Sequence, residues 1–93
     1  MAAFDPQFID EQRSRVNGVF LGPVRWHVFA LLWERMGRWV ARSSLVLNSP
    51  KYFEKPDTQA SVKTHVCNIR KALVGTPYAI ESEYGHGYRM VKR

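Results

Sequence analysis

The clearest hydrophobic pattern in the chain lies in its last third. Four aliphatic residues recur there at steps of four, three and four, namely Val62, Val66, Ile69 and Leu73. This spacing places them on one face of an α-helix, and Gly75 with Thr76-Pro77 predicts where the helix ends. The opposite face and its flanks are polar or basic and carry no acid. They consist of Lys63, Thr64, His65, Cys67, Asn68, Arg70 and Lys71.

Two further helices are predicted before this one. Gly22-Pro23 marks the start of the first, because proline suits the first helical position, and apolar residues recur from there toward Met36. Gly37 is well placed to end that helix. A shorter helix is expected over residues 42–47, stopped by "NSP", since proline disfavours a helical conformation at the residue before it. Residues 48–57 are then expected to form a loop.

Both ends of the domain show the pattern of a β-hairpin. Asn17-Gly18 lies between short apolar stretches, and both residues tolerate positive φ, which predicts a tight turn. Toward the C-terminus, "YAIESEYGHGYRMV" alternates in polarity and predicts two strands that turn at Gly85-His86-Gly87. The order is therefore hairpin, three helices, hairpin, which is an α+β arrangement typical of a winged helix.

Charge favours a polyanionic partner. The chain has 14 Lys and Arg residues against 8 Asp and Glu, a formal net charge of +6. No acid occurs between Arg35 and Phe53 or between Thr58 and Ile80, and both gaps contain Lys or Arg. Phosphate backbones are the commonest partners of proteins with this balance.

Length and apolar content indicate one compact domain. A chain of 93 residues has room for one core, so residues 1–93 are expected to form a single domain with residues 1–7 as a flexible N-terminal tail. The three tryptophans, Trp26, Trp33 and Trp39, are assigned to that core. Apolar runs such as "VFALLW" are far shorter than the roughly 20 residues of a membrane span, and no signal peptide is visible. A cytoplasmic, nucleoid-associated protein is expected.

Other chemistry finds no support in the sequence. The single cysteine, Cys67, cannot form an internal disulfide. His65 and Cys67 diverge on a helix, so they do not make a metal site with His27. No nucleophile, base and orienting residue occur at a recognisable spacing, and no glycine-rich loop leads into a helix. We expect neither an enzyme nor a bound cofactor or metal.

Two long stretches resemble a known family. "LGPVRWHVFALLWERMGRWVARSSL" and "SVKTHVCNIRKALVGTPYAIESEYGHGYRMV" are similar to the C-terminal DNA-binding domain of OmpR/PhoB-type response regulators. The most specific parts are "VxxHVxxIRKAL" and "GxGYR". The resemblance implies a winged helix-turn-helix with a four-stranded N-terminal sheet, three helices and a C-terminal hairpin called the wing. It also implies a sequence-specific transcriptional regulator of prokaryotic or phage type, with its third helix in the major groove of duplex DNA and its wing near the minor groove.

The resemblance also implies roles for individual residues. Lys63, Thr64, Cys67 and Asn68 match positions that face bases, whereas His65 and Tyr88 match residues that contact the DNA backbone. The complete predicted DNA-binding set is Lys63, Thr64, His65, Cys67, Asn68, Arg70, Lys71, Ser82, Tyr84, His86, Tyr88 and Arg89. In relatives the loop before the third helix can touch RNA polymerase, and the corresponding partner-contact residues are Tyr52, Phe53 and Lys55. Family members usually bind as head-to-tail pairs, so a monomer that pairs on DNA is expected.

The sequence departs from the family pattern in the wing. Tyr84 stands where relatives commonly have the arginine that enters the minor groove, and Glu81 and Glu83 add negative charge nearby. The receiver domain that normally precedes this module is not part of the sequence, so regulation by aspartyl phosphorylation within the chain is not expected. An alternative function therefore stays open at this point. It is a protein-interaction module of winged-helix fold that modulates RNA polymerase or another regulator without specific DNA binding.

Overall fold

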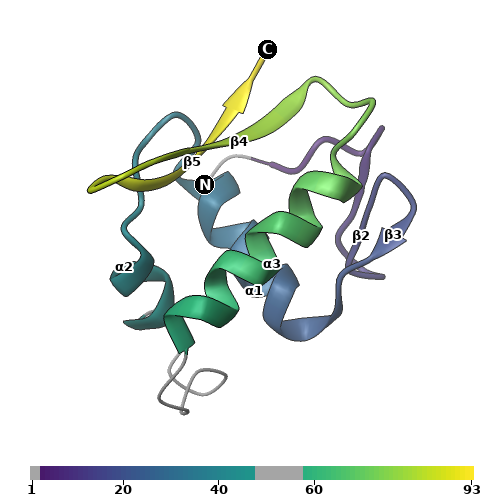
Figure 1. The fold of residues 1–93 in the computed structure, drawn as a ribbon. Coiled ribbons are helices and arrows are strands. Elements are labelled where there is room, and N and C mark those ends of the chain that lie inside the picture. The colour runs from purple at the N-terminus through teal and green to yellow at the C-terminus, as the bar shows by residue number, and fades with distance from the viewer. Residues whose placement is uncertain (1–2, 48–57) are drawn as a thin grey trace.

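The computed structural model describes residues 3–47 and 58–93. Over these residues it shows an α+β fold with three short strands, three helices and a C-terminal hairpin (Figure 1). The elements are β1 (Ile9–Asp10), β2 (Arg15–Val16), β3 (Val19–Phe20), α1 (Gly22–Glu34), α2 (Arg42–Leu47), α3 (Thr58–Ala72), β4 (Tyr78–Glu83) and β5 (Gly87–Lys92). The predicted order of elements is confirmed. No helix within the described residues is both long and apolar enough to cross a membrane.

The N-terminal sheet contains the predicted hairpin but fewer strands than the resemblance implies. Val16 pairs with Val19, which leaves Asn17-Gly18 as a two-residue turn with φ values of 52° and 80°. Positive φ at both positions is what such a turn requires. The sheet has three strands among the described residues, in the order β1-β2-β3, instead of four. Just before β1, the Ile9 amide donates to the Asp5 carbonyl over 2.8 Å, so this segment turns back and offers no extended edge for a further strand.

The start of the described chain is packed against the core. The Phe4 ring lies 5.2 to 6.0 Å, between centroids, from the rings of Trp26, Phe29 and Trp33. The Tyr78 hydroxyl donates to Asp5 Oδ2 over 2.8 Å. Aromatic pairs at these distances and a hydrogen bond at a part-buried site both stabilise a fold. Phe4 and Asp5, which fall within the tail expected over residues 1–7, thus make contacts with the core.

The helices lie close to their predicted positions. α1 ends at Glu34, two residues before the expected Met36, because the chain turns there and Gly37 donates its amide to the Met90 carbonyl over 2.7 Å. α2 has the predicted bounds. Three residues of the predicted stripe lie in α3 and the fourth, Leu73, directly follows its last residue; all four are at most 3% exposed, which confirms the helical pattern.

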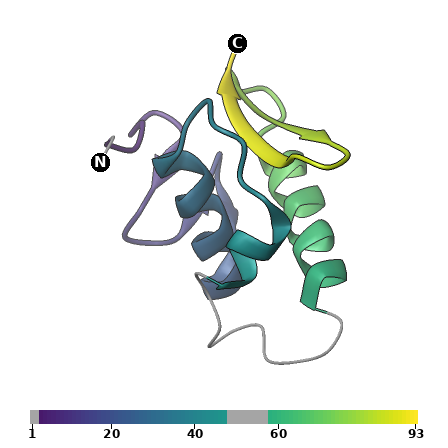
Figure 2. The ribbon, with the colours of Figure 1, turned by 90° about the vertical axis from the view of Figure 1, so that its left-hand side faces the viewer.

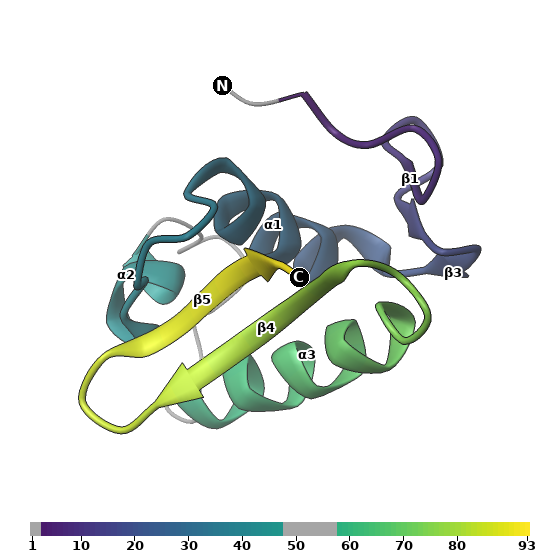
Figure 3. The same cartoon turned by 90° about the horizontal axis from the view of Figure 1, so that it is seen from above.

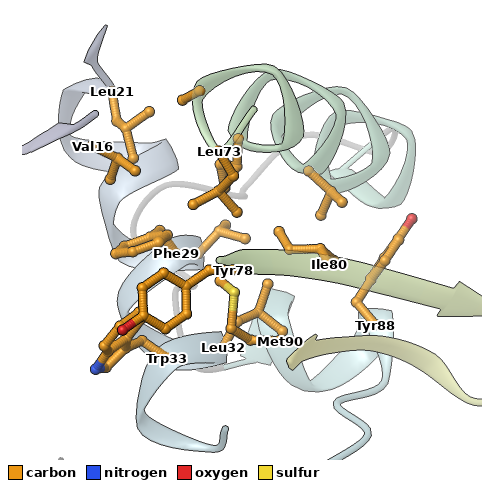
Figure 4. Packing of buried hydrophobic residues seen from close by; sticks show 14 of the residues in the cluster. Val16, Leu21, Phe29, Leu32, Trp33, Leu73, Tyr78, Ile80, Tyr88 and Met90 are labelled. Atoms are coloured by element: carbon orange, nitrogen blue, oxygen red, sulfur yellow. The ribbon is translucent and has the colours of Figure 1, made fainter. Parts of the chain in front are cut away.

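The core joins every part of the fold (Figure 4). It takes Val16 from the N-terminal sheet, Phe29 and Leu32 from α1, Ile69 from α3 and Met90 from the wing, all of them fully buried. Of the tryptophans, Trp33 belongs to this cluster and Trp26 packs against it. Trp39 was expected in the core, but it is half-buried and lies outside the cluster, against the wing.

The wing is attached to the connection between α1 and α2. β4 and β5 form six antiparallel pairs, from Tyr78 with Lys92 to Glu83 with Gly87. Val40 bridges Tyr88 on the other side of β5, with N–H···O distances of 2.7 and 2.9 Å. Seen from above, the hairpin lies over the helices and its tip extends past the end where α2 lies (Figure 3).

The wing turn lies one residue earlier than predicted. Because Glu83 pairs with Gly87, the turn consists of Tyr84, Gly85 and His86, and Gly87 is the first residue of β5. Gly87 has φ 102°, and a Cβ there would overlap the Val40 carbonyl and lie 2.8 Å from the Ala41 Cα. Gly87 is therefore needed for the approach of β5 to its neighbouring segment, more than for the turn itself.

Gly87→Ala should destabilise the domain far more than Gly85→Ala. Both glycines have positive φ, but a Cβ at Gly85 meets nothing within 4 Å. We expect Gly85→Ala to lower the free energy of unfolding by about 1 kcal/mol through backbone strain alone. Gly87→Ala should lower it by about 3 kcal/mol or more, since the bridge hydrogen bonds are lost as well. Urea denaturation followed by circular dichroism measures both, and equal losses would contradict the close-packing role of Gly87.

Candidate nucleic-acid interface

The outer face of α3 presents the side chains that the sequence places there. Lys63, Thr64, Cys67 and Lys71 are exposed, on the side of the helix away from the buried stripe. His65 and Asn68 are half-buried at its borders. The described part of this face, residues 62–72, contains no Asp or Glu. It is therefore an exposed, basic and hydrogen-bonding helix surface.

Asn68 is engaged with its own helix. Its Nδ2 donates to the Thr64 carbonyl, one turn earlier, over 3.0 Å. An asparagine reads adenine by offering its amide oxygen and nitrogen together. Asn68 must therefore turn its amide away from the helix backbone before it can make that pair.

His65 connects α3 to α1. Arg25 Nε donates to His65 Nδ1 over 3.2 Å. Burial, and then the neighbouring Arg25 charge, lower the pKa of His65 below its ordinary 6.5. With Nδ1 acting as an acceptor, the bond assigns the ring proton to Nε2. The imidazole is thus neutral near pH 7, and any contact it makes with a phosphate is a hydrogen bond from a neutral ring rather than an ion pair.

A groove of about 580 Å³ separates the wing tip from the helices. Its helix side is formed by Ala41, Arg42 and Ser43 around the start of α2 and by Lys63 of α3; its other side is the wing from Ser82 to Tyr88. Figure 2 shows the start of α2 and the wing hairpin beside α3. The groove collects five of the predicted DNA-binding residues, namely Lys63, Ser82, Tyr84, His86 and Tyr88.

Polar residues that were not in the predicted DNA-binding set also line this groove, namely Arg42 and Ser43 on the helix side and Glu83 on the wing. A signal for Arg42 was present, because it begins the second helix within the acid-free stretch that follows Arg35. Its position opposite the wing could not be predicted, because Arg42 is far from the wing in sequence and only the fold brings the start of α2 to the wing tip.

The tyrosines of the groove differ strongly in exposure. Tyr88 is only 7% exposed, and Figure 4 shows its hydroxyl pointing away from Ile80 and Met90. A DNA contact through Tyr88 is therefore limited to the edge of the ring that carries the hydroxyl. Tyr84, at the wing tip, is 100% exposed and offers its whole ring.

Both arginines of the predicted DNA-binding set, Arg70 and Arg89, make contacts within the protein. Arg89 Nε donates to Glu81 Oε1 over 2.9 Å, and a second nitrogen of the guanidinium meets the same oxygen. The Arg89 guanidinium also lies 4.4 Å from the centre of the Trp39 ring. Arg70 Nε donates to the Ile80 carbonyl over 3.1 Å. Neither arginine lines the groove, so the structure uses both to hold the wing.

The predicted partner-contact residues, Tyr52, Phe53 and Lys55, lie outside the described residues. Contact with RNA polymerase through them stays a prediction. Within residues 3–47 and 58–93, no group of three His, Cys, Asp or Glu side chains could hold a metal ion.

Comparison with known proteins agrees with this geometry. A family model described as "Transcriptional regulatory protein, C terminal" matches residues 17–90. The match runs from the β2–β3 turn to Met90 in β5, so it includes the outer face of α3 and both sides of the groove. No curated protein matched the chain.

The His65 pKa should lie below 6.5 and depend on Arg25. Burial lowers this pKa most and the Arg25 charge adds to the effect. We expect Arg25→Gln to raise it while leaving it below 6.5. Because the folded state disfavours protonation, the stability contributed by neutral His65 is present above pH 6.5 and is lost as the pH falls through the lowered value. NMR titration of the ring, assigned by loss of the signal in His65→Ala, measures both values; a pKa at or above 6.5 would contradict the buried arrangement.

Proposed function

The chain belongs to the OmpR/PhoB-type family of transcriptional regulatory proteins, whose C-terminal domain binds DNA, and on this premise we propose that it binds a specific duplex sequence with α3 in the major groove. The wing then lies at the adjacent minor groove. The outer face of α3 carries this proposal, because it is exposed, basic and free of acids in its described part. A major groove about 12 Å wide admits a helix with such a face.

The face divides into residues suited to bases and residues suited to phosphates. Thr64 offers a methyl group for contact with thymine, and Asn68 offers the amide that pairs with adenine. Lys63 reaches either guanine acceptors or phosphates, and it lines the groove together with Arg42. Lys71, at the other end of the face, suits the phosphate backbone. Base contacts would set the sequence preference, while phosphate contacts would set affinity and register.

We infer that the protein is a monomer in solution and pairs on adjacent DNA sites. A single module makes few phosphate contacts, and two modules on neighbouring sites gain affinity through effective concentration. Analytical ultracentrifugation should show a monomer without DNA and two chains per duplex that carries a repeated site. A stable dimer without DNA would contradict this inference.

Asn68→Ala should change the sequence preference of DNA binding, whereas Lys71→Ala should change its overall affinity. Asn68→Ala should lower discrimination between the preferred duplex and its single-base variants by about tenfold, since a good base pair contact is worth about 1–3 kcal/mol. Lys71→Ala should weaken all duplexes alike and reduce the slope of log K against log salt by about 1. Selection from random duplex DNA supplies the preferred site, and fluorescence anisotropy over a salt series measures both effects.

The matched control for charge is Arg13→Ala, because Arg13 is an exposed cation between β1 and β2, outside the proposed interface. It should leave affinity and salt slope close to wild type. Identical behaviour of the Asn68 and Lys71 variants would contradict the division of roles. Absence of binding by the wild-type chain even at low salt would overturn the proposed function itself and favour the protein-interaction alternative.

A further inference from the structure

The wing tip is held in a fixed position. The Glu83–Gly87 pair and a hydrogen bond of 3.0 Å from the His86 amide to the Glu83 carbonyl close its turn. The bridge between Val40 and Tyr88 fixes the base of the tip, and the His86 ring lies against Trp39, 5.6 Å between centroids. A tip held in this way meets a ligand with a defined set of groups.

Those groups are acidic and aromatic. From Glu81 to Gly87 the wing has two carboxylates and no Lys or Arg. Glu83 and Tyr84 both line the groove opposite Arg42 and Lys63, so they lie on the side that meets the duplex in the proposed function. The nearest cation of the hairpin, Arg89, is held by Glu81 and Trp39. The tip therefore presents negative charge and a fully exposed ring to DNA.

Minor grooves of different sequence differ in width, electrostatic potential and hydrogen-bonding groups, and these properties decide how well such a tip fits. A-tracts have a narrow minor groove with enhanced negative potential, which attracts cations and so repels the Glu83 carboxylate. A narrow groove also resists an aromatic ring, because rings enter the minor groove where base steps open and widen. A G·C pair adds the guanine N2 amino group, a hydrogen-bond donor on the floor of the minor groove that an A·T pair lacks.

We propose that Glu83 and Tyr84 make the wing select against A-tracts and for wider, G·C-containing minor grooves next to the site read by α3. This inference rests on the proposed function and states which minor-groove sequences the wing would prefer. Glu83 sets the preference by repulsion from A-tracts and by accepting a hydrogen bond from guanine. Tyr84 supplies the contact area, since its ring is wholly exposed in the free protein.

The test uses duplexes that share the selected α3 site and differ only in the flank beneath the wing, either an A-tract or a G·C-containing step. Wild type should bind the G·C flank about threefold or more tightly than the A-tract. Glu83→Gln should reduce this preference, and Tyr84→Arg should reverse it. Tyr84→Ala should lose about fivefold or more on the G·C flank, because stacking and burial of the ring are lost, and Tyr84→Phe, which keeps the ring, should lose less than Tyr84→Ala.

Glu34→Gln is the control for net charge, as it removes an exposed carboxylate at the end of α1 and should leave the flank preference unchanged. Circular dichroism checks that the tip variants fold, and we expect that they do because Glu83 and Tyr84 are exposed. Wild-type binding that is indifferent to the flank, or stronger on the A-tract, overturns this inference and leaves the proposed function standing. Absence of binding to every duplex overturns both.

Discussion

The position of the wing depends on one contact between backbones. β5 approaches the segment between α1 and α2 so closely that Gly87 has no room for a side chain. Val40 and Tyr88 then exchange two hydrogen bonds, and Gly37 adds a third to Met90. The connection between the helices thus acts as a third strand beside the hairpin. Because a two-stranded hairpin alone is only marginally stable, this third segment and the core beneath it are what give the wing a fixed shape.

The same contact builds the groove from parts that are far apart in sequence. α2 begins at Arg42, two residues after Val40, so the bridge places Arg42 and Ser43 opposite the wing tip. The buried stripe of α3 holds that helix against the shared core and brings Lys63 to the same groove. A change that loosened the bridge would therefore alter the positions of the wing and of the start of α2 together, and with them the two sides of the proposed DNA interface.

The sequence predicted what local patterns determine. The stripe of α3 follows from helical periodicity, and the Asn17-Gly18 turn follows from two residues that tolerate positive φ, so both are confirmed. The exposed face of α3 follows from the stripe. Contacts between distant segments were not predicted. Nothing near Trp39 or Phe4 in sequence shows that one packs on the wing and the other on the core aromatics.

Gly87 was predicted as part of the wing turn, but in the structure it is the first residue of β5. "GHG" fits a turn of three residues by composition, but strand pairing assigns Gly87 to β5. The decisive constraint on Gly87 is the Val40 backbone, which lies 47 residues away by number and has no signature in the local pattern. Pairing register and close approach are long-range properties, so a local reading recovers the hairpin and misses why its second glycine is needed.

The distribution of charge differs between the helices and the wing, which form the two sides of the proposed DNA interface. Arg70 and Arg89 stabilise the wing through Ile80 and Glu81, which lowers the share of their charge available to phosphates. In the proposed binding mode, counterion release would then come largely from Lys63, Lys71 and Arg42, which belong to the helices. On the proposed function, the helices supply most of the attraction to phosphates, whereas the acidic, aromatic tip supplies the minor-groove preference and the contact area of Tyr84. In the proposed binding mode, a change at the tip alters the minor-groove preference and the contact area there, while the attraction of the α3 cations to the phosphates stays.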